Sequence, residues 1–455
     1  MSQNEPEFEG DTNLSARRAA FRETVDEPTR RLLEADAVSF LHQSLSTPCL
    51  DVVHSAEGIY FTSLSGKRYM DFHGNSAHHI GYGHRRLVET LKRQLDDLVF
   101  SPRRYTNEAA VALASRLAET MPGSFSKTLL IPGGSEAVEV ALRLARGATG
   151  RFKTISFWGA FHGAGFGASS VGGEALFRSG PTGPLLPGAN HVPPVYCYRC
   201  PYGHSPDPDC CMMAAETIRY VLEAERDVAA VIAEPIRSVP LVPPPSFWSE
   251  VRRACDEHGA LLIFDEIASG LGKTGRMWAC QHYDVEPDIL VTGKGLGGGI
   301  VPLAAVCARP GLDVLGDWSI GHYTHEKNPF LARAGLTVLD IIEEEGLVSN
   351  AAEVGDHAMV LGRQLQDRHE IIGDVRGKGL LIGLELVTDR ETKQPANDAA
   401  DALLYRCLER GLSFKVTSGN VATLSPPLVT TREEIDQAFA ILDEALTVDR
   451  DRFTL

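Results

Sequence analysis

The sequence contains no long apolar run. None of its 455 residues belongs to a stretch of the ~20 consecutive apolar residues that a membrane-spanning helix requires. The first residues, MSQNEPEFEGDTNLSARR, include neither the basic nor the apolar region of a secretory signal. We therefore expect a protein that does not span a membrane and that is located in the cytoplasm.

Positive charge is also scarce. Lysine and arginine total 44 against 60 aspartates and glutamates, which gives a formal net charge of −16. A negative field of this size repels phosphate backbones and anionic lipid surfaces. Neither nucleic acid nor a membrane is therefore expected as a partner.

Cysteine gives little support to a disulfide framework. The nine cysteines are an odd number, and most stand singly in apolar segments, where a reduced thiol behaves as a small hydrophobic group. One segment differs, because Cys197 and Cys200 form a C-x2-C pair that Cys210 and Cys211 follow. This spacing could hold a structural zinc ion. The surrounding prolines favour a plain surface insertion, and we predict no metal site.

From about Lys127 onward, short apolar runs alternate with amphipathic segments. This alternation predicts an α/β fold with a doubly wound, mostly parallel sheet, in which ligands bind at the carboxyl ends of the strands. The expected strands are Thr128–Ile131, Thr154–Phe157, Val228–Ala233, Ala260–Phe264 and Ile289–Thr292, and the expected helices are Glu136–Arg146 and Phe247–His258.

After Asn328 the pattern changes to longer helices, a β-rich block and a closing helix, which together predict a smaller α+β domain. The segment Gly58–Asp71 predicts a hairpin with its turn at Ser65 and Gly66. We expect an N-terminal segment, residues 1–95, that packs with the small domain. The large domain is expected at residues 96–327 and the C-terminal small domain at residues 328–455.

Two expected strands end in residues that indicate chemistry. Lys294 follows one strand between two glycines, and Asp265 follows another. Such a lysine is suited to form a Schiff base with a flat cofactor, and a neighbouring carboxylate could keep a pyridine nitrogen protonated. The turn at Gly133, Gly134 and Ser135 leads from a strand into a helix, where free backbone N–H groups bind phosphate well. Each feature alone also occurs without function; their joint placement favours a cofactor site.

Seven segments, taken in order, resemble the class III aminotransferases, which are pyridoxal 5'-phosphate (PLP) enzymes of fold type I. The segments are IPGGSEAVEVALRLAR, FHG, AAVIAEPI, LLIFDEIASGLGKTGRM, PDILVTGKGLGGGIVPLAAV, YTHEKNP and IGDVRGKGLLIGLELV. The resemblance implies an aspartate-aminotransferase-like fold, PLP as the cofactor, a small-molecule amine as the substrate, and a homodimer, or a tetramer, with shared active sites.

The same resemblance implies roles for individual residues. Lys294 would be the Schiff-base lysine and Asp265 the partner of the pyridine nitrogen, so these two are the expected catalytic residues. Thr324 would reach the phosphate across a dimer interface. The further cofactor-binding residues implied are Gly134 and Ser135 at the phosphate, Phe161 and Ile267 on the two ring faces, Glu234 near the ring, and His162, which lies inside the FHG motif and has no assigned role.

Three positions depart from the pattern of transaminases that use glutamate. Thr423 stands where those enzymes place an arginine that binds the α-carboxylate, and Val239 stands where they place a glutamate that screens it. Ala268 replaces a glutamine near the ring hydroxyl. The missing carboxylate clamp disfavours a 2-oxoglutarate-dependent transaminase and leaves an ω-amine:pyruvate transaminase open.

Other segments are similar to PLP lyases. The segment HGNSAHHIG is similar to part of the phospho-lyases that act on ethanolamine phosphate. The segments EGDTNLS, FLHQSLSTPCL, RRYTNEAA and HYTHEKNP are similar to the (R)-1-hydroxy-2-aminoethylphosphonate ammonia-lyases. We therefore predict an ammonia-lyase that converts this phosphonate amino alcohol to phosphonoacetaldehyde and ammonia. The ω-amine:pyruvate transaminase and the phospho-lyase remain the alternatives.

A phosphonate dianion requires cationic side chains in its pocket. Four cations lie within the motif segments, and for each of them an ordinary surface charge or ion pair is an equally good interpretation. The expected substrate-binding residues are Arg103, Arg104, Arg237, Lys327 and His78.

Overall fold

The computed structural model describes residues 15–43, 46–47, 49–203 and 211–447. The chain forms two compact units. The larger unit contains residues 77–80 and 85–349, and the smaller unit contains the described residues of 1–76, 81–84 and 350–455. No helix in the described part of the chain is both long and apolar enough to cross a membrane.

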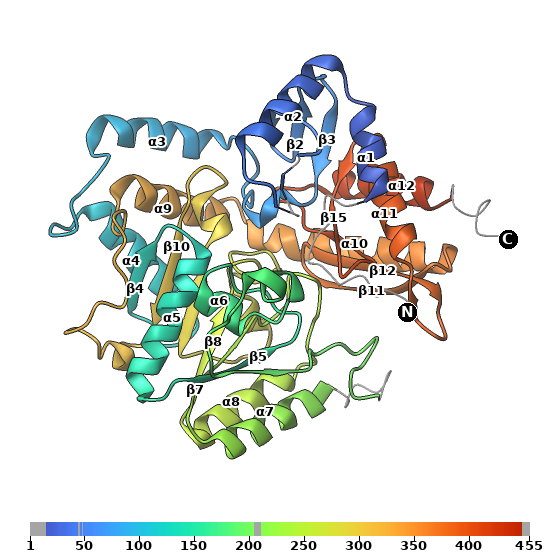
Figure 1. Ribbon diagram of the computed structural model, residues 1–455. Coiled ribbons are helices and arrows are strands. Elements are labelled where there is room, and N and C mark those ends of the chain that lie inside the picture. The colour runs from blue at the N-terminus through green and yellow to red at the C-terminus, as the bar shows by residue number, and fades with distance from the viewer. Residues whose placement is uncertain (1–14, 44–45, 48, 204–210, 448–455) are drawn as a thin grey trace. The chain divides into compact units, whose positions relative to one another are not determined.

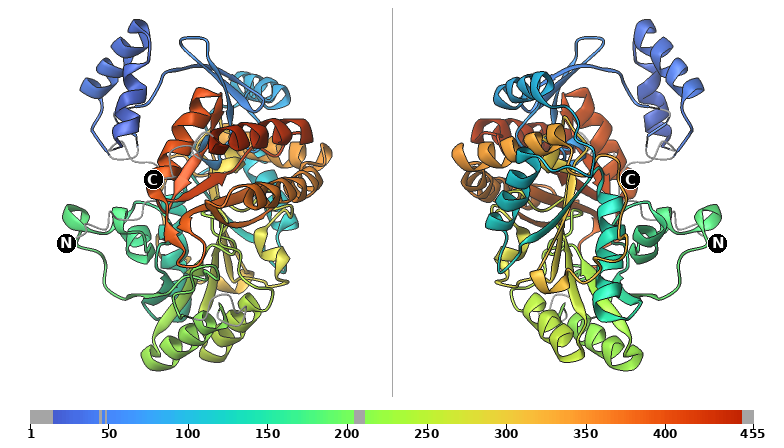
Figure 2. Two further views of the ribbon diagram at one scale, coloured as in Figure 1. Left: turned by 90° about the vertical axis from the view of Figure 1, so that its right-hand side faces the viewer. Right: turned by 90° about the vertical axis from the view of Figure 1, so that its left-hand side faces the viewer.

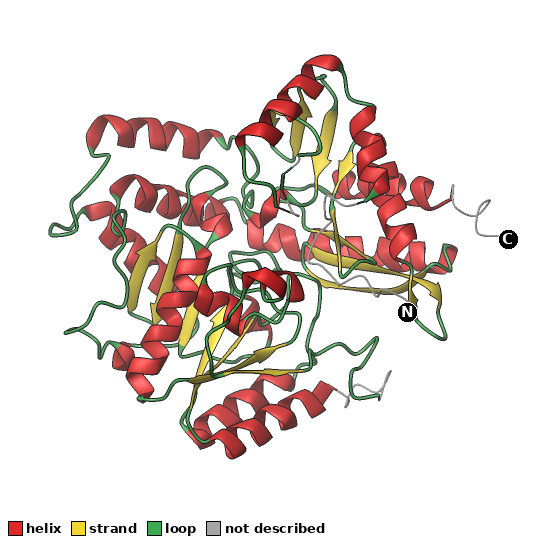
Figure 3. Ribbon diagram, viewed as in Figure 1, coloured by secondary structure: helices red, strands yellow, loops and turns green. Residues whose placement is uncertain are grey.

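A seven-stranded sheet forms the centre of the larger unit (Figure 1, Figure 3). Strand β10 runs antiparallel to both of its neighbours, and the other neighbouring pairs are parallel. In spatial order the strands are β4 (Lys127–Ile131), β10 (Ala304–Ala308), β9 (Ile289–Thr292), β8 (Leu261–Asp265), β7 (Val228–Ala233), β5 (Lys153–Phe157) and β6 (Ala189–Val192). This sheet confirms the predicted α/β class.

The strands of this sheet are apolar because helices cover it. All six residues of β7 are buried, as expected for a strand that is packed on both faces. Helix α5 (Gly134–Thr149) packs Val138, Ala141 and Leu142 into one core with residues of β7, β8 and β9. Helices α7 (Met212–Glu225) and α8 (Phe247–His258) lie side by side (Figure 2).

The remaining helices of the larger unit extend it beyond the boundaries expected from the sequence. Helix α9 (Pro329–Glu344) packs on α3 (Arg85–Asp97) and α4 (Glu108–Thr120), and Arg86 donates to Glu344 at 2.7 Å. The unit therefore ends at Ser349 rather than at Lys327, and it includes α3. Its short helices are α6 (Phe166–Val171), η2 (Ala175–Phe177), η3 (Gly180–Thr182), η5 (Ala279–His282), η6 (Lys294–Gly297) and η7 (Pro310–Leu312).

The smaller unit is built from residues of both the N-terminal and the C-terminal parts of the chain. The expected hairpin consists of β2 (Tyr60–Ser63) and β3 (Arg68–Asp71), and β3 pairs in parallel with β14 (Leu412–Ser413). Phe72 O accepts a hydrogen bond from Ser425 N at 2.7 Å. The other elements are β1 (Val53–Glu57), η1 (Gly74–Ser76), β11 (Ile372–Lys378), β12 (Leu381–Asp389), β13 (Gln394–Pro395), β15 (Lys415–Thr417), β16 (Val421–Leu424), α1 (Ala16–Glu23), α2 (Glu27–Ser39), α11 (Asn397–Glu409), α12 (Arg432–Thr447) and α10 (Leu347–Arg368), which begins at the boundary.

Candidate active site

Asp265 and Lys294 lie at the carboxyl ends of two paired strands. Asp265 is the last residue of β8, is 3% exposed, and pairs with Val291 of β9. Lys294 follows β9 by two residues and opens η6 with a left-handed φ of 45°. A positive φ is uncommon for a residue other than glycine and is often found at functional sites. The strand register thus brings the acid and the amine to one edge of the sheet.

The carboxylate of Asp265 is held at both oxygen atoms. Nδ1 of His162 donates to Oδ2 at 2.8 Å, and Ile267 N donates to Oδ1 at 3.1 Å. His162 is 2% exposed, and its Nε2 has no hydrogen-bond partner among the described residues. The contact fixes the orientation of the carboxylate and leaves one buried polar atom that a bound molecule could satisfy.

The beginning of α5 lies close to Ile267, which follows Asp265 by two residues, and to Ala164, which follows His162 by two residues. A Cβ atom on Gly134 would lie 2.8 Å from Cδ1 of Ile267, so no larger residue fits there without movement. Ser135 Oγ accepts from Ala164 N at 3.1 Å, directly after the Phe161–His162 segment. The first N–H groups of α5 have no side-chain cap, because the N-cap residue is Gly133. This turn can therefore bind an anion such as a phosphate.

Phe161 and Glu234 lie at the ends of the two strands beyond β8. The Phe161 ring packs against the ring of Phe177 with 4.6 Å between centroids. Glu234 directly follows β7, and its Oε2 accepts from Ser238 N at 3.0 Å. Both residues thus belong to the same edge of the sheet as Asp265.

The side chain of Arg237 is held by other residues of the protein. Its guanidinium donates to Gly159 O and lies 4.0 Å from Oε1 of Glu234. Arg237 and Glu234, with Trp158 and Val195, line a cavity of about 40 Å³, which is room for a few water molecules at most. The side chain is only 16% exposed, so a substrate anion would have to compete with Glu234 for its charge.

Arg103, Arg104, Thr324 and Lys327 lie elsewhere, in two exposed loops of the larger unit. Asn107 Nδ2 donates to Lys327 O at 2.7 Å, and Asn328 Nδ2 donates to Val99 O at 3.3 Å, so the two loops are joined. The side chains of Arg103, Arg104 and Lys327 make no ion pair within the described parts of the chain. The structure thus places three predicted cations on two loops that are hydrogen-bonded to each other.

The loop that contains Thr324 also contacts the first turn of α5. Tyr323 Oη donates to Glu136 O at 3.5 Å, in the first turn of that helix. No contact that the structure describes joins Thr324 itself to the Asp265 cluster. Thr324 remains a predicted cofactor-binding residue.

His78 is buried, at 1% exposed, and so is its neighbour His79. His79 is the residue of the two that packs on the turn of Lys294, because a Cβ on Gly295 would lie 2.5 Å from the ring of His79. The sequence prediction named only His78. The doubled histidine before a glycine-rich turn was the available signal, but it does not say which ring faces the lysine.

The three departures from the transaminase pattern occupy buried positions. Thr423 lies on β16 of the smaller unit, and its Oγ1 is 2.8 Å from Oγ1 of Thr417. Val239 and Ala268, in the larger unit, are 2% and 7% exposed. None of these side chains can bind a carboxylate as a charged partner.

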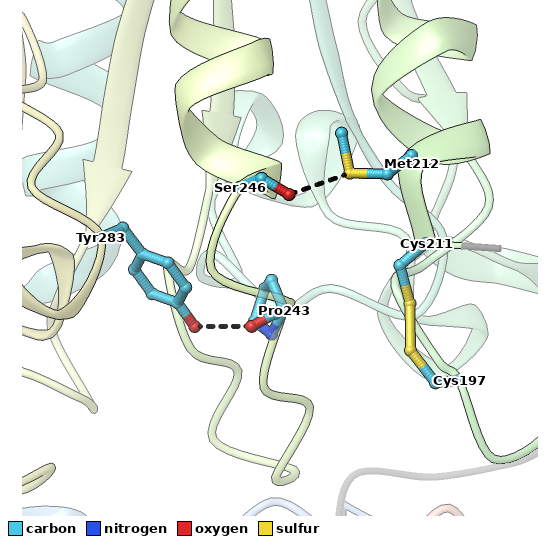
Figure 4. Close-up of a disulfide and its surroundings, with 6 residues drawn as sticks. All are labelled: Cys197, Cys211, Met212, Pro243, Ser246 and Tyr283. Carbon is cyan, nitrogen blue, oxygen red and sulfur yellow. Dashed lines mark hydrogen bonds between the residues drawn. A yellow bond between two sulfur atoms is a disulfide. The ribbon is translucent and has the colours of Figure 1, made fainter. Parts of the chain in front are cut away.

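A disulfide that the sequence prediction missed closes the cysteine-rich segment (Figure 4). Cys197 is bonded to Cys211, which directly precedes α7, and Cys200 takes no part in this bond. Cys210, the fourth candidate zinc ligand, lies outside the described residues. Elsewhere in the described chain, no three histidine, cysteine or acidic side chains group together as a metal site. The disulfide uses two of the four candidate ligands.

The cluster therefore fits a flat cofactor that carries an aldehyde, a ring nitrogen and a phosphate. Lys294 could hold the aldehyde, Asp265 could pair with the ring nitrogen, and the Gly134–Ser135 turn could bind the phosphate. The buried, unpaired Nε2 of His162 and the space that only a glycine leaves at position 134 are the structural observations in favour of this fit.

Comparison with known proteins adds independent information. Residues 42–446 match the family model described as Aminotransferase class-III. Over 455 residues the chain is 43% identical to (R)-1-hydroxy-2-aminoethylphosphonate ammonia-lyase of Vibrio splendidus, with 96% of this chain and 94% of the relative covered. It is 37% identical to a leucine/methionine racemase of Thermococcus litoralis, with 84% and 87% covered. The PLP-bound amine transaminase of an uncultivated Pseudomonas species superposes with a TM-score of 0.85 at 30% identity, with 90% and 98% covered.

Proposed function

Because the chain belongs to the class III aminotransferase family, we propose that it is a PLP-dependent ammonia-lyase that acts on a small phosphonate amino alcohol. The proposed substrate is (R)-1-hydroxy-2-aminoethylphosphonate, and the products are phosphonoacetaldehyde and ammonia. The observation that carries this proposal is the 43% identity to the enzyme of that name over 96% of the chain. The absence of a charged clamp at Thr423 supports it, because the proposed substrate has no carboxylate.

PLP, when bound, supplies an electron sink for the electron pair that remains after a C–H bond is broken. Asp265 would hold a proton on the ring nitrogen through the oxygen that His162 leaves accessible. His162 would keep the carboxylate in that orientation through its 2.8 Å hydrogen bond. Phe161 and Ile267 would contact the two ring faces, and Glu234 would lie near the ring.

Lys294 has two roles in this proposal. Its Nζ would hold the cofactor aldehyde in the absence of substrate. When substrate is bound, the Nζ of Lys294 would remove a proton from the carbon that bears the nitrogen. The hydroxyl on the adjacent carbon would then leave with its electron pair and a proton as water. Addition of one water and loss of ammonia give the aldehyde, so no second substrate is consumed.

The phosphonate dianion would be bound by the cations of the two joined loops. Arg103, Arg104 and Lys327 are exposed there, beside the apolar side chains of Val99 and Tyr105, which are 50% and 63% exposed. Leu95, Leu98 and Phe100 of the same segment are exposed as well, and a group of exposed apolar residues favours a protein interface. We therefore propose a homodimer in which these loops, together with Thr324, complete the partner's active site; His78 and Arg237 remain further candidates.

We expect the cytoplasm as the location. The support is that Cys49, Cys255, Cys280, Cys307 and Cys407 are free thiols. The Cys197–Cys211 disulfide argues against this location, because disulfides persist mainly in oxidising compartments.

The test is to incubate the purified protein and PLP with (R)-1-hydroxy-2-aminoethylphosphonate, without a keto acid, and to assay ammonia and aldehyde. The lyase predicts continuous release of both in equal amounts, and none from the Lys294→Ala variant. A single turnover that pyruvate restores would establish the transaminase instead. Inorganic phosphate released from ethanolamine phosphate would establish the phospho-lyase, and loss of optical activity from leucine would indicate a racemase.

A further inference from the structure

His79 lies between the two loops that follow the catalytic strands. Its Nε2 is 3.3 Å from the carbonyl oxygen of Gly270, in the loop after Asp265. Its ring packs on Gly295, the residue after Lys294, where an added Cβ would lie 2.5 Å from both Cγ and Nδ1. The side chain is 1% exposed. One buried ring thus contacts the segments of both residues proposed to act on the cofactor.

The hydrogen bond fixes the tautomer of this ring. A carbonyl oxygen only accepts, so Nε2 must carry the proton that is donated to Gly270 O. Burial, with Lys273, His78 and Lys294 as further positive neighbours, holds the pKa of His79 well below its ordinary value. The ring is therefore neutral, and its Nδ1 is an acceptor.

That acceptor faces the turn of Lys294. Nδ1 is buried and has no hydrogen-bond partner among the residues that the structure describes, and it is one of the two ring atoms nearest to Gly295. The turn itself is strained, because Lys294 adopts a φ of 45° that only glycine adopts easily. A backbone conformation of this kind persists only where rigid neighbouring residues hold it.

We propose that His79 is a positioning residue, which holds the backbone of Lys294 at a fixed separation from the Asp265 loop by packing on Gly295 and donating to Gly270 O. The proposal rests on the proposed binding of PLP to Lys294. It assigns to His79 no contact with the substrate. The competing explanation is that His79 only fills space in the core, and the two explanations differ in what happens to the lysine.

The experiment compares His79→Ala, His79→Gln and His282→Ala with the wild-type protein. His79→Ala removes both the ring and the donor, whereas Gln keeps an N–H donor. His282 is the matched control, because its Nε2 likewise lies near a backbone carbonyl oxygen, that of Thr274, at 3.0 Å. Two quantities are measured for each protein: the dissociation constant of PLP, and the pH midpoint of the visible absorbance that PLP acquires on Lys294.

We expect His79→Ala to weaken PLP binding about tenfold, the cost of one buried hydrogen bond, and to shift the pH midpoint. His79→Gln should recover part of both, and His282→Ala should change neither. Unchanged values in His79→Ala, or equal changes in His282→Ala, would overturn the proposal. If the wild-type protein acquires no visible band, the proposed function fails and this inference fails with it; a wild-type band with an unaffected His79→Ala variant refutes the inference alone.

Discussion

Nδ1 of His162 donates to Oδ2 of Asp265 across 2.8 Å, in a position where both side chains are almost completely buried. The second carboxylate oxygen accepts from Ile267 N at 3.1 Å. A carboxylate held in this orientation can still accept a further hydrogen bond. A protonated ring nitrogen requires such an acceptor.

Replacing Asp265 by Ala should lower kcat by about 100-fold or more, because the ring nitrogen loses the group that keeps it cationic. His162→Ala should lower kcat by about tenfold, since it removes one hydrogen bond to a charged group. Steady-state kinetics with both variants checks this order. Exposed His322 provides the control, and a His162→Ala enzyme with unchanged kcat would contradict the role given to the pair.

The double variant Arg103→Ala/Arg104→Ala should raise KM for the phosphonate by about tenfold or more, because the dianion loses charge-assisted contacts. The kcat should change little, since neither residue is proposed to move a proton. Lys92→Ala/Arg93→Ala removes the same charge from exposed positions on α3 and should leave KM unchanged. Equal effects of the two double variants would show that only the net charge matters.

Glu266 should make the free energy of unfolding depend on pH. Burial raises the pKa of this carboxyl from 4.5 to about 7 in the folded protein. Between these values the folded state binds more protons than the unfolded state, so stability falls as pH rises from about 4.5 to about 7. The variant Glu266→Gln lacks this contribution. Its stability relative to the wild type should therefore rise by roughly 2–3 kcal/mol between pH 4.5 and pH 8.

Urea unfolding of both proteins at the two pH values measures that difference. Because the other titrating groups are common to both proteins, their contributions cancel in the comparison. A stability difference that stays constant with pH would mean that Glu266 titrates near its ordinary value despite its burial.

The disulfide between Cys197 and Cys211 should stabilise the larger unit. It closes a loop with a sequence separation of 14, for which the expected contribution is about 3 kcal/mol. Reductant should lower the thermal midpoint of the wild-type protein and should have no such effect on Cys197→Ser/Cys211→Ser. Cys49→Ser, which removes a free thiol, should respond to reductant as the wild type does. A thermal midpoint that reductant leaves unchanged would argue against the bond.

Local sequence patterns were sufficient for much of this fold. The predicted strands Val228–Ala233 and Ile289–Thr292 agree with β7 and β9 to the residue, because buried parallel strands are continuous apolar runs. Strand β10 was missed, since its short run AAVCA carries no sign of the antiparallel pairing that places it between β4 and β9. Pairing partners depend on tertiary structure, which no local pattern encodes.

The candidate site likewise combines residues that the sequence predicted with contacts that it did not predict. Lys294 and Asp265 could be proposed from the sequence because each follows a recognisable strand within a family motif. The contact of His79 with Gly270 joins residues 191 positions apart, and the contact of His162 with Asp265 joins residues 103 apart. Such contacts appear only when the chain is folded.

The most direct test of the account is a search for the covalent link to Lys294. The purified protein is incubated with PLP, reduced with borohydride, digested, and analysed by peptide mass spectrometry. We predict a single pyridoxyl-phosphate addition on Lys294 and its loss in the Lys294→Ala variant. An unmodified Lys294 in the presence of abundant PLP, or a label that resides on another lysine such as Lys273, would contradict the account.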